Sequence, residues 1–381
     1  MERAQALLPS AESAPPGMDD ERRRHLDLFL SAAREIPPQQ AYAHGRGIVT
    51  CGSLKFTAYL WILIRSLRHH GCTLPIELWH MEGEINEPLR RFLEPHGVTF
   101  RDAGHLQWAM GQFLNARHGI KPYAILHSSF REIIFLDADN CVFRDPTFLF
   151  DTDAFVRHRA IFWPDWSATA GRLGAADLRR DFGLDAGGEE FETGQIVVDR
   201  VDCWRALTLT LHLAQHADYY FRFLYGDKEA FHLAFDFVQQ SYLLVPHPVL
   251  SWRGDWERKG FIQHWIDGQP LFHHRVGRKW EAIVTREESH DLPALPAAVV
   301  REILVELRRR WSSVVPIRER LRFHAGIARR VSRDRRPAWL ERILDSWLGY
   351  YLRLLGSPTR LRASLEARVA RVRRGRRAPR D

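Results

Sequence analysis

The sequence predicts an α/β protein with a mostly parallel sheet flanked by helices, followed by a helical, arginine-rich C-terminal segment. Short apolar runs typical of buried strands alternate with segments of helical apolar spacing, and turn residues separate them. Strands that alternate with helices favour parallel pairing, because a parallel connection needs a long crossover. The C-terminal expectation comes from composition, since residues 300–381 hold 23 arginines and no lysine.

The expected elements follow one another from Gly47 onward. Residues 47–50 form a short strand, and Phe56–Leu67 shows helical apolar spacing that ends near a glycine. In order along the chain we then expect strands at 75–79, 98–101, 133–136, 192–199 and 270–275, helices at 87–93, 121–128 and 204–224, and loops at 162–166 and 277–280. We expect a poorly ordered lead-in over residues 1–42 with a short polar helical stretch between its two Pro-Pro pairs, a catalytic domain over 43–292, and a basic amphipathic helical segment over 293–381.

Length, hydropathy and cysteine usage limit the class of protein. The 381 residues suffice for one large α/β domain with an appendage. No apolar stretch approaches the ~20 residues of a membrane span, and residues 1–20 lack the pattern of a secretion signal. The four cysteines are widely spaced without a Cys-x-x-Cys pair, which argues against a zinc site and fits reduced thiols. We therefore expect a cytoplasmic protein.

Positive charge is concentrated at the C-terminal end. The net charge is +8, but residues 300–381 combine 23 arginines with eight acidic residues, so the first 299 residues are net −7. Apolar stripes at helical spacing run from Ile303 to Trp311 and from Leu340 to Leu355. They predict helices that pack on the rest of the protein; the second interpretation is peripheral contact with the inner face of a membrane. Nucleic acid is not an expected partner, because no binding module is recognisable.

Two carboxylates follow the most apolar of the expected strands. Ile133–Leu136 leads directly into Asp137 and Asp139, and residues at positions i and i+2 of a strand face the same way. Ligands of open α/β sheets bind beyond the carboxyl ends of the strands. Paired carboxylates there suit Mg²⁺ or Mn²⁺, with diphosphate oxygens completing the coordination.

Seven sequence blocks in order resemble the nucleotide-sugar-dependent glycosyltransferases of the GT-A fold. They cover about residues 45–282, and are similar to the fungal-type α-1,3-mannosyltransferases and their bacterial relatives. More distantly they resemble the retaining family of glycogenin and the lipopolysaccharide galactosyltransferases. The blocks are Gly47-Ile48-Val49-Thr50-Cys51-Gly52, Leu74-Pro75-Ile76-Glu77-Leu78-Trp79, Phe135-Leu136-Asp137-Ala138-Asp139-Asn140 with Arg144-Asp145-Pro146, Phe162-Trp163-Pro164-Asp165, Glu192-Thr193-Gly194-Gln195, Gly226-Asp227-Lys228-Glu229 and His274-Arg275-Val276-Gly277-Arg278-Lys279-Trp280.

The resemblance implies roles for particular residues. Asp137, Asp139 and His274 are the expected metal ligands, and the imidazole of His274 favours Mn²⁺ over Mg²⁺. The expected nucleotide- and diphosphate-binding residues are Thr50, Cys51, Gly52, Lys121, Gly277 and Lys279. The residues expected around the transferred sugar are Gln195, Asp227 and Lys228, with Trp163, Asp165 and Trp166 towards the acceptor.

The resemblance also implies a reaction. We expect a sugar to move from a nucleotide donor to a glycan or lipid-linked acceptor with retention of configuration. GDP-mannose is the favoured donor, and a UDP-hexose is the alternative. A retaining double displacement needs a carboxylate about 3 Å from the anomeric carbon, and an amide such as Gln195 is a poor nucleophile. A front-face route therefore remains open.

Two other functions compete with this interpretation. Phosphatases of the haloacid dehalogenase type also carry Asp-x-Asp after an apolar strand, but near the start of the domain and followed by Thr or Val where this chain has Cys141. A non-catalytic, membrane-associated scaffold is the third interpretation. The retention of Asp137, Asp139, His274 and Lys279 argues against a scaffold.

Overall fold

Seven strands form the main sheet of the computed structural model, which describes residues 18–36, 43–104, 116–165, 174–185, 188–251, 260–275 and 294–316. The strand order is β3-β2-β1-β4-β7-β6-β8. The strands are β1 (Arg46–Cys51), β2 (Ile76–His80), β3 (Val98–Asp102), β4 (Glu132–Leu136), β6 (Ala160–Pro164), β7 (Phe191–Asp199) and β8 (Leu243–Leu244). The chain divides into two units, Met1–Glu319 and Arg320–Asp381, and every described residue belongs to the first.

Most strand pairs of this sheet are parallel. Strand β1 pairs in parallel with β2 and β4, β2 with β3, and β6 with β8, whereas β7 runs antiparallel to both β4 and β6. Strand β4 lies in the middle, and its residues Ile133–Leu136 are fully buried because both faces of the sheet are covered. The predicted α/β class with a mainly parallel sheet is confirmed.

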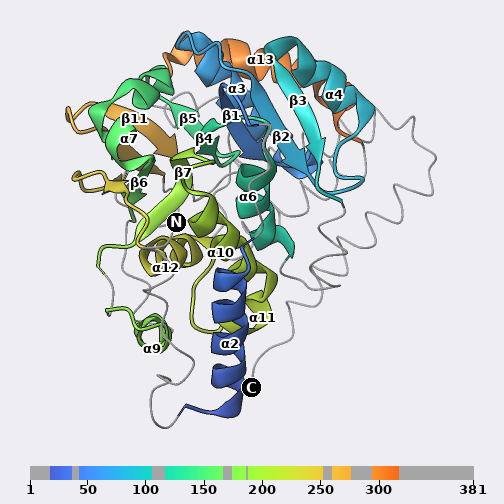
Figure 1. Cartoon of the computed structure of the whole chain (residues 1–381). Coiled ribbons are helices and arrows are strands. Elements are labelled where there is room, and N and C mark those ends of the chain that lie inside the picture. The colour runs from blue at the N-terminus through green and yellow to red at the C-terminus, as the bar shows by residue number, and fades with distance from the viewer. Residues whose placement is uncertain are drawn as a thin grey trace, which may run out of the picture. The chain divides into compact units, whose positions relative to one another are not determined.

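Helices cover the two faces of the sheet (Figure 1). Helices α3 (Thr57–His69), α4 (Glu87–Leu93) and α13 (Ala297–Val314) lie on one side, and α6 (Ala116–His127), α10 (Trp204–Gln215) and α12 (Asp227–Phe237) on the other. The remaining helices are α2 (Asp20–Arg34), α7 (Asp153–His158), α9 (Ala175–Asp181) and α11 (Ala217–Tyr220), with 3₁₀ turns at Leu54–Phe56, Glu94–His96 and Pro146–Asp151. The long helix expected over 204–224 is therefore divided between α10 and α11.

A second, four-stranded sheet lies at the edge where β4 ends. Its order is β5-β11-β10-β9, from the strands β5 (Asn140–Val142), β9 (Leu250–Ser251), β10 (Phe261–His264) and β11 (Pro270–His274). Strand β11 pairs antiparallel with β5, which places His274 opposite Asn140. This pairing connects the late strand directly to the turn after β4, although about 130 residues separate them in the sequence.

The helical stretch expected within the lead-in is the packed helix α2, so this part of the lead-in is not poorly ordered. Asp19 caps α2 by accepting a hydrogen bond from the Arg22 backbone N–H, and Arg22 pairs with Asp181 of α9 at 2.6 Å. Two turns further along the same side of the helix, Phe29 is fully buried in a core cluster shared with α9, α10, α11 and α12. Residues 20–34 are thus part of the folded body.

The loop expected at 162–166 is also different, because β6 occupies Ala160–Pro164. Trp163 is fully buried, and its indole N–H donates to the His264 carbonyl at 2.9 Å. Aromatic residues favour strands as strongly as β-branched ones, and Pro164 is tolerated because it is the last residue of its strand. Trp163 therefore belongs to the core and does not reach an acceptor, while Trp166 lies outside the described residues.

The first of the two C-terminal apolar stripes is buried. Helix α13 presents Ile303 and Leu307 to the body, and the Trp61 indole N–H donates to the Ile303 carbonyl at 3.0 Å. Asn86 holds the other end of the helix by donating to the Val314 carbonyl at 2.9 Å. This stripe packs on the protein, as the first interpretation predicted. The second stripe and the arginine cluster lie outside the described residues, and among the described helices none is long and apolar enough to cross a membrane.

A group of partly buried histidines predicts acid sensitivity of the body. Burial, together with the charges of neighbouring His216 and His25, lowers the pKa of His212 in α10 to about 3. The unfolded chain takes up this proton near pH 6.5, so it binds more protons than the folded protein between about pH 6.5 and 3. The free energy of unfolding must therefore decrease as the pH is lowered from about 6.5 to 3.

We expect His212→Leu to flatten this dependence. Between pH 7.5 and 5.0 the variant should lose about 1–2 kcal/mol less unfolding free energy than the wild type, as measured by urea denaturation at both pH values. His69→Gln, which replaces an exposed histidine, is the matched control and should follow the wild type. The same loss of unfolding free energy in all three proteins would show that His212 does not cause the pH dependence of stability.

Candidate functional site

A tight turn after β4 brings two carboxylates to the carboxyl edge of the main sheet. The Asp137 backbone N–H donates to the Gly194 carbonyl of β7 at 2.8 Å, and the Asn140 backbone N–H returns to the Asp137 carbonyl at 2.9 Å. The Asn140 side chain donates to the same Gly194 carbonyl at 2.7 Å. The chain is thereby fixed on both sides of Asp139, which is 7% exposed.

His274 at the end of β11 completes a cluster with these carboxylates. Its Nε2 lies 3.2 Å from Asp139 Oδ1 and 3.9 Å from Asp137 Oδ2. One ligand atom from each of the three residues falls within 4.8 Å of the other two. The backbone N–H of Arg275 donates to the Asp139 carbonyl at 3.0 Å, so the spacing between the aspartates and the histidine is set by main-chain hydrogen bonds.

Gly194 makes room for the histidine ring. A Cβ atom at this position would lie 2.4 Å from His274 Cε1 and Nδ1, which is closer than side chains tolerate. Any residue other than glycine at position 194 would therefore displace the imidazole. The neighbouring His273 points elsewhere, since its ring lies over Gly260. The expected opposite orientation of the two histidines is confirmed.

The donor set fits a divalent cation. Two carboxylate oxygens and one imidazole nitrogen converge, and the far ring nitrogen of His274, Nδ1, lies 3.4 Å from Glu192 Oε1. Metal-binding histidines usually face a carboxylate with their second nitrogen, which fixes the orientation of the ring. Carboxylates with one imidazole suit Mn²⁺, and Mg²⁺ less well.

Electrostatics within the cluster are strong. Burial works to lower the pKa of His274, but the charges of Asp139 and Glu192 outweigh it and raise the pKa to about 10. Burial works to raise the pKa of Glu192, but the attraction to His274 lowers it to about 2. The attraction between His274 and these two carboxylates thus helps to hold the imidazole between them.

Lys121 of α6 joins the metal cluster to the start of α12. Its Nζ lies 2.8 Å from Asp227 Oδ2 and 3.3 Å from Asp137 Oδ2, and it donates to the Thr193 carbonyl at 2.9 Å. Burial lowers the pKa of Lys121, but attraction to Asp137 and Asp227 outweighs it, and the pKa lies above its ordinary value. The structure therefore brings Lys121, Asp137, Asp139, Asp227 and His274 together.

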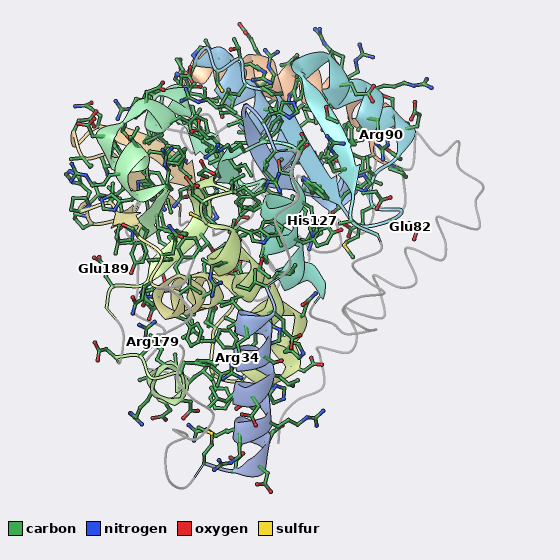
Figure 2. The ribbon with its side chains drawn as sticks, in the orientation of Figure 1. Arg34, Glu82, Arg90, His127, Arg179 and Glu189 are labelled. Atoms are coloured by element: carbon green, nitrogen blue, oxygen red, sulfur yellow. The ribbon has the colours of Figure 1, made fainter. Side chains whose placement is uncertain are left out.

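The sequence analysis assigned no role to Glu192. Its contact with His274 predicts that it orients the imidazole ring. We expect Glu192→Gln to weaken Mn²⁺ binding about 10- to 100-fold, because the ring loses its charged orienting partner. Titration followed by the EPR signal of free Mn²⁺ measures this directly. The exposed Glu189, labelled in Figure 2, offers a matched control: Glu189→Gln removes a nearby carboxylate without touching the cluster. Equal affinities of both variants would exclude Glu192 from the site.

The residues expected to border a nucleotide lie at the end of β1. The Cys51 thiol contacts the Ile120 carbonyl at 3.9 Å, next to Lys121, and burial raises the pKa of this thiol. Gly52 follows the strand, and its backbone N–H donates to the Trp79 carbonyl at 3.0 Å. Thr50 is fully buried within the sheet. Gly277 and Lys279 lie outside the described residues.

Gln195 is not brought to the cluster. The residue is fully buried, at 0% exposure, and lies in β7 opposite Leu136. The adjacent Ile196 belongs to the core beneath α6, so alternation along the strand directs Gln195 to the other face of the sheet from Lys121. Neither amide atom has a hydrogen-bond partner among the described residues.

Lys228 is engaged by carboxylates. Its Nζ pairs with Asp165 at the end of β6, and lies 3.3 Å from Glu190 Oε2 and 3.5 Å from Glu229 Oε1. These contacts tie the start of α12 to the main sheet and leave Asp227 directed at Lys121. Asp165, expected on the acceptor side, is thus an ion-pair partner of Lys228, and so is Glu190, which the sequence analysis did not single out.

Comparison with known proteins identifies relatives. A family model described as “Mannosyltransferase putative” matches residues 45–173 and 181–264. Alpha-1,2-mannosyltransferase MNN2 of Saccharomyces cerevisiae is 26% identical over 171 residues, which are 44% of this chain and 28% of the relative. Alpha-1,2-mannosyltransferase MNN26 of Candida albicans is 24% identical over 268 residues, 58% of this chain and 35% of the relative. The similarity thus covers well under half the length of either relative.

The solved structures to which this chain is similar include glycosyltransferases. The galactosyltransferase LgtC, in complex with donor and acceptor sugar analogues, is 16% identical, with a TM-score of 0.43 over 69% of this chain and 99% of that one. The mannosyltransferase Ktr4p from S. cerevisiae is 10% identical, with a TM-score of 0.39 over 61% of this chain and 80% of that one.

Proposed function

Because the chain belongs to the mannosyltransferase family whose model covers residues 45–173 and 181–264, we propose that it is a metal-dependent mannosyltransferase of the GT-A type. The donor is GDP-mannose, and the acceptor is a glycan or a lipid-linked sugar. The observation that carries the proposal is the cluster of Asp137, Asp139 and His274 at the carboxyl edge of the sheet, where α/β proteins bind nucleotides.

The cluster supplies what departure of a nucleoside diphosphate requires. Asp137, Asp139 and His274 would hold Mn²⁺, which stabilises the charge that develops on the diphosphate. Lys121 adds a second fixed positive charge on the same side, 3.3 Å from Asp137. Asp227, paired with Lys121, is the carboxylate available to orient hydroxyls of the transferred sugar. Because these groups are positioned in advance, they stabilise the transition state without reorganising.

We propose that the reaction retains configuration and proceeds on one face of the sugar. A double displacement needs a free nucleophile about 3 Å from the anomeric carbon, and Gln195 is buried on the far face of the sheet. Asp227 is held in an ion pair with Lys121 at 2.8 Å. A front-face route, in which the departing diphosphate itself assists the acceptor hydroxyl, needs no further protein nucleophile.

The linkage is a finer part of the proposal. The sequence blocks resemble α-1,3-mannosyltransferases, whereas the curated relatives carry the name alpha-1,2-mannosyltransferase. Linkage depends on which acceptor hydroxyl the loops around the site present. We propose an α-mannosyl product, whose linkage is to be determined by NMR of the isolated disaccharide.

Calorimetric titration with GDP and with UDP, each with and without Mn²⁺, tests the donor. Metal-dependent binding of GDP alone supports the mannosyltransferase. Binding of UDP alone shifts the donor to a UDP-hexose and keeps the metal site. Binding of neither nucleotide contradicts the proposal and returns the phosphatase and scaffold interpretations, which a phosphatase assay with a small phosphate ester then separates.

A further inference from the structure

Lys121 is placed so that it competes with a metal ion for Asp137. Its Nζ lies 3.3 Å from Asp137 Oδ2, the same oxygen that lies 3.9 Å from His274 Nε2 in the cluster. The side chain is only 11% exposed, so solvent screens its charge weakly. We propose that Lys121 couples the two binding events of the site, making Mn²⁺ binding weak until an anionic diphosphate is present.

The competition follows from charge and distance. A divalent cation held by Asp137, Asp139 and His274 must share a carboxylate with the lysine, so the two positive charges lie within a few ångströms of each other. At such separations the repulsion in a partly buried site is substantial, since the effective dielectric is far below that of water. The cation alone therefore binds less tightly than three protein ligands would otherwise allow.

Lys121 has reason to remain beside the cation. An ammonium group has three N–H donors, and three acceptors other than Asp137 surround it: Asp227 Oδ2 at 2.8 Å, the Thr193 carbonyl at 2.9 Å and Thr193 Oγ1 at 3.3 Å. When a metal takes Asp137, the lysine can thus keep a full set of hydrogen bonds without leaving its position. Its charge persists at the site in both states.

A diphosphate relieves the repulsion. Its negative charge interacts favourably with both the cation and Lys121, so each promotes the binding of the other, and the coupling is reciprocal. This step depends on the proposed function, because it takes the ligand to be a nucleoside diphosphate. Competition between Lys121 and the cation does not depend on it, and it can be measured without nucleotide.

The Lys121→Met variant tests the competition. Methionine keeps an unbranched chain of similar length and removes the charge. In the absence of nucleotide we expect it to bind Mn²⁺ at least about tenfold more tightly than the wild type, within the range of typical coupling factors. The measurement is the EPR signal of free Mn²⁺, repeated with GDP present. The enhancement of Mn²⁺ binding by GDP should be smaller in the variant than in the wild type.

Lys55→Met is the matched control, because Lys55 is exposed and its removal changes the net charge equally. It should leave Mn²⁺ binding unchanged. Lys121→Gln serves if the methionine variant does not fold, as judged by thermal unfolding.

We expect Asp227→Asn to change Mn²⁺ affinity in the opposite direction to Lys121→Met. Without its closest carboxylate partner Lys121 relies more on Asp137, so Mn²⁺ binding should weaken. If Asp227 acts through Lys121, the same change in the Lys121→Met background should have little effect, which a double-mutant cycle reveals.

The outcomes separate this proposal from the proposed function. Unchanged or weaker Mn²⁺ binding by Lys121→Met, while Asp139→Ala loses it, overturns the coupling role and leaves the metal site intact. Mn²⁺ that binds neither wild type nor any variant, with or without GDP, overturns the metal site and both proposals. Tighter Mn²⁺ binding by Lys121→Met without any nucleotide binding supports the competition but refutes the nucleotide-dependent function.

Discussion

Asp139→Ala is expected to abolish metal-dependent nucleotide binding while the protein stays folded. Asp139 Oδ1 lies 3.2 Å from His274 Nε2, and Asp139 is one of the three residues whose ligand atoms converge. Its removal takes away a ligand and a charge that favours the cation, so affinity should fall by more than about 100-fold, beyond the effect of losing an outer-shell partner. The Asp139 carbonyl still accepts from the Arg275 backbone N–H, so the main chain keeps its geometry.

Calorimetry with GDP and Mn²⁺, together with circular dichroism, measures both parts of this result. Asp267→Ala is the matched control, because Asp267 pairs with Arg144 in a surface ion pair and is half exposed. It should bind nucleotide as the wild type does. Undiminished binding by Asp139→Ala would remove this residue from the metal site.

Gly194→Ala is expected to damage the same site without changing any ligand. The new Cβ would lie 2.4 Å from the His274 ring, and the ring is wedged between the β7 backbone and the aspartates. Either the imidazole or β7 must shift, at a cost of about 1–3 kcal/mol in stability. A displacement of about 1 Å is enough to cost on the order of 100-fold in a positioned site. Thermal unfolding and Mn²⁺ titration follow the two effects.

Gly188→Ala provides the comparison, because a Cβ there meets no atom within 4 Å. It should change neither stability nor Mn²⁺ binding appreciably. Wild-type affinity in Gly194→Ala would mean that the position of the His274 ring is not required for the metal, and His274 would lose its assignment as a ligand.

Local patterns in the sequence were sufficient for the centre of the fold. The apolar run Ile133–Leu136 and the carboxylates after it identify β4 and its functional end, because a strand buried on both faces has no polar alternation. The aromatic stretch around Trp163 was misinterpreted as a loop, since its role depends on pairing with β7 rather than on local sequence. Helix α2 was likewise missed as part of the core, because its partners lie in α9 to α12.

The arrangement of the site could be predicted only in part. Resemblance identified Asp227 and Lys121, but nothing in either segment indicates that they form an ion pair across 106 residues. The role of Glu192 follows from its contact with His274, which exists only once β7 and β11 converge. Gln195 shows the converse error: it occupies a matching block, yet strand alternation directs it away from the cluster. Contacts between distant segments decide these cases.

The position of β11 has a practical consequence for dividing this protein into parts. The family similarity ends at residue 264, whereas His274 lies ten residues further along, on the strand that joins β5 to β10. A fragment trimmed at the limit of the similarity would retain both aspartates but lose the imidazole and β11, one of the two inner strands of the smaller sheet. The shortest fragment able to hold a cation by these three ligands must therefore extend past His274, beyond the last residue that the family model matches.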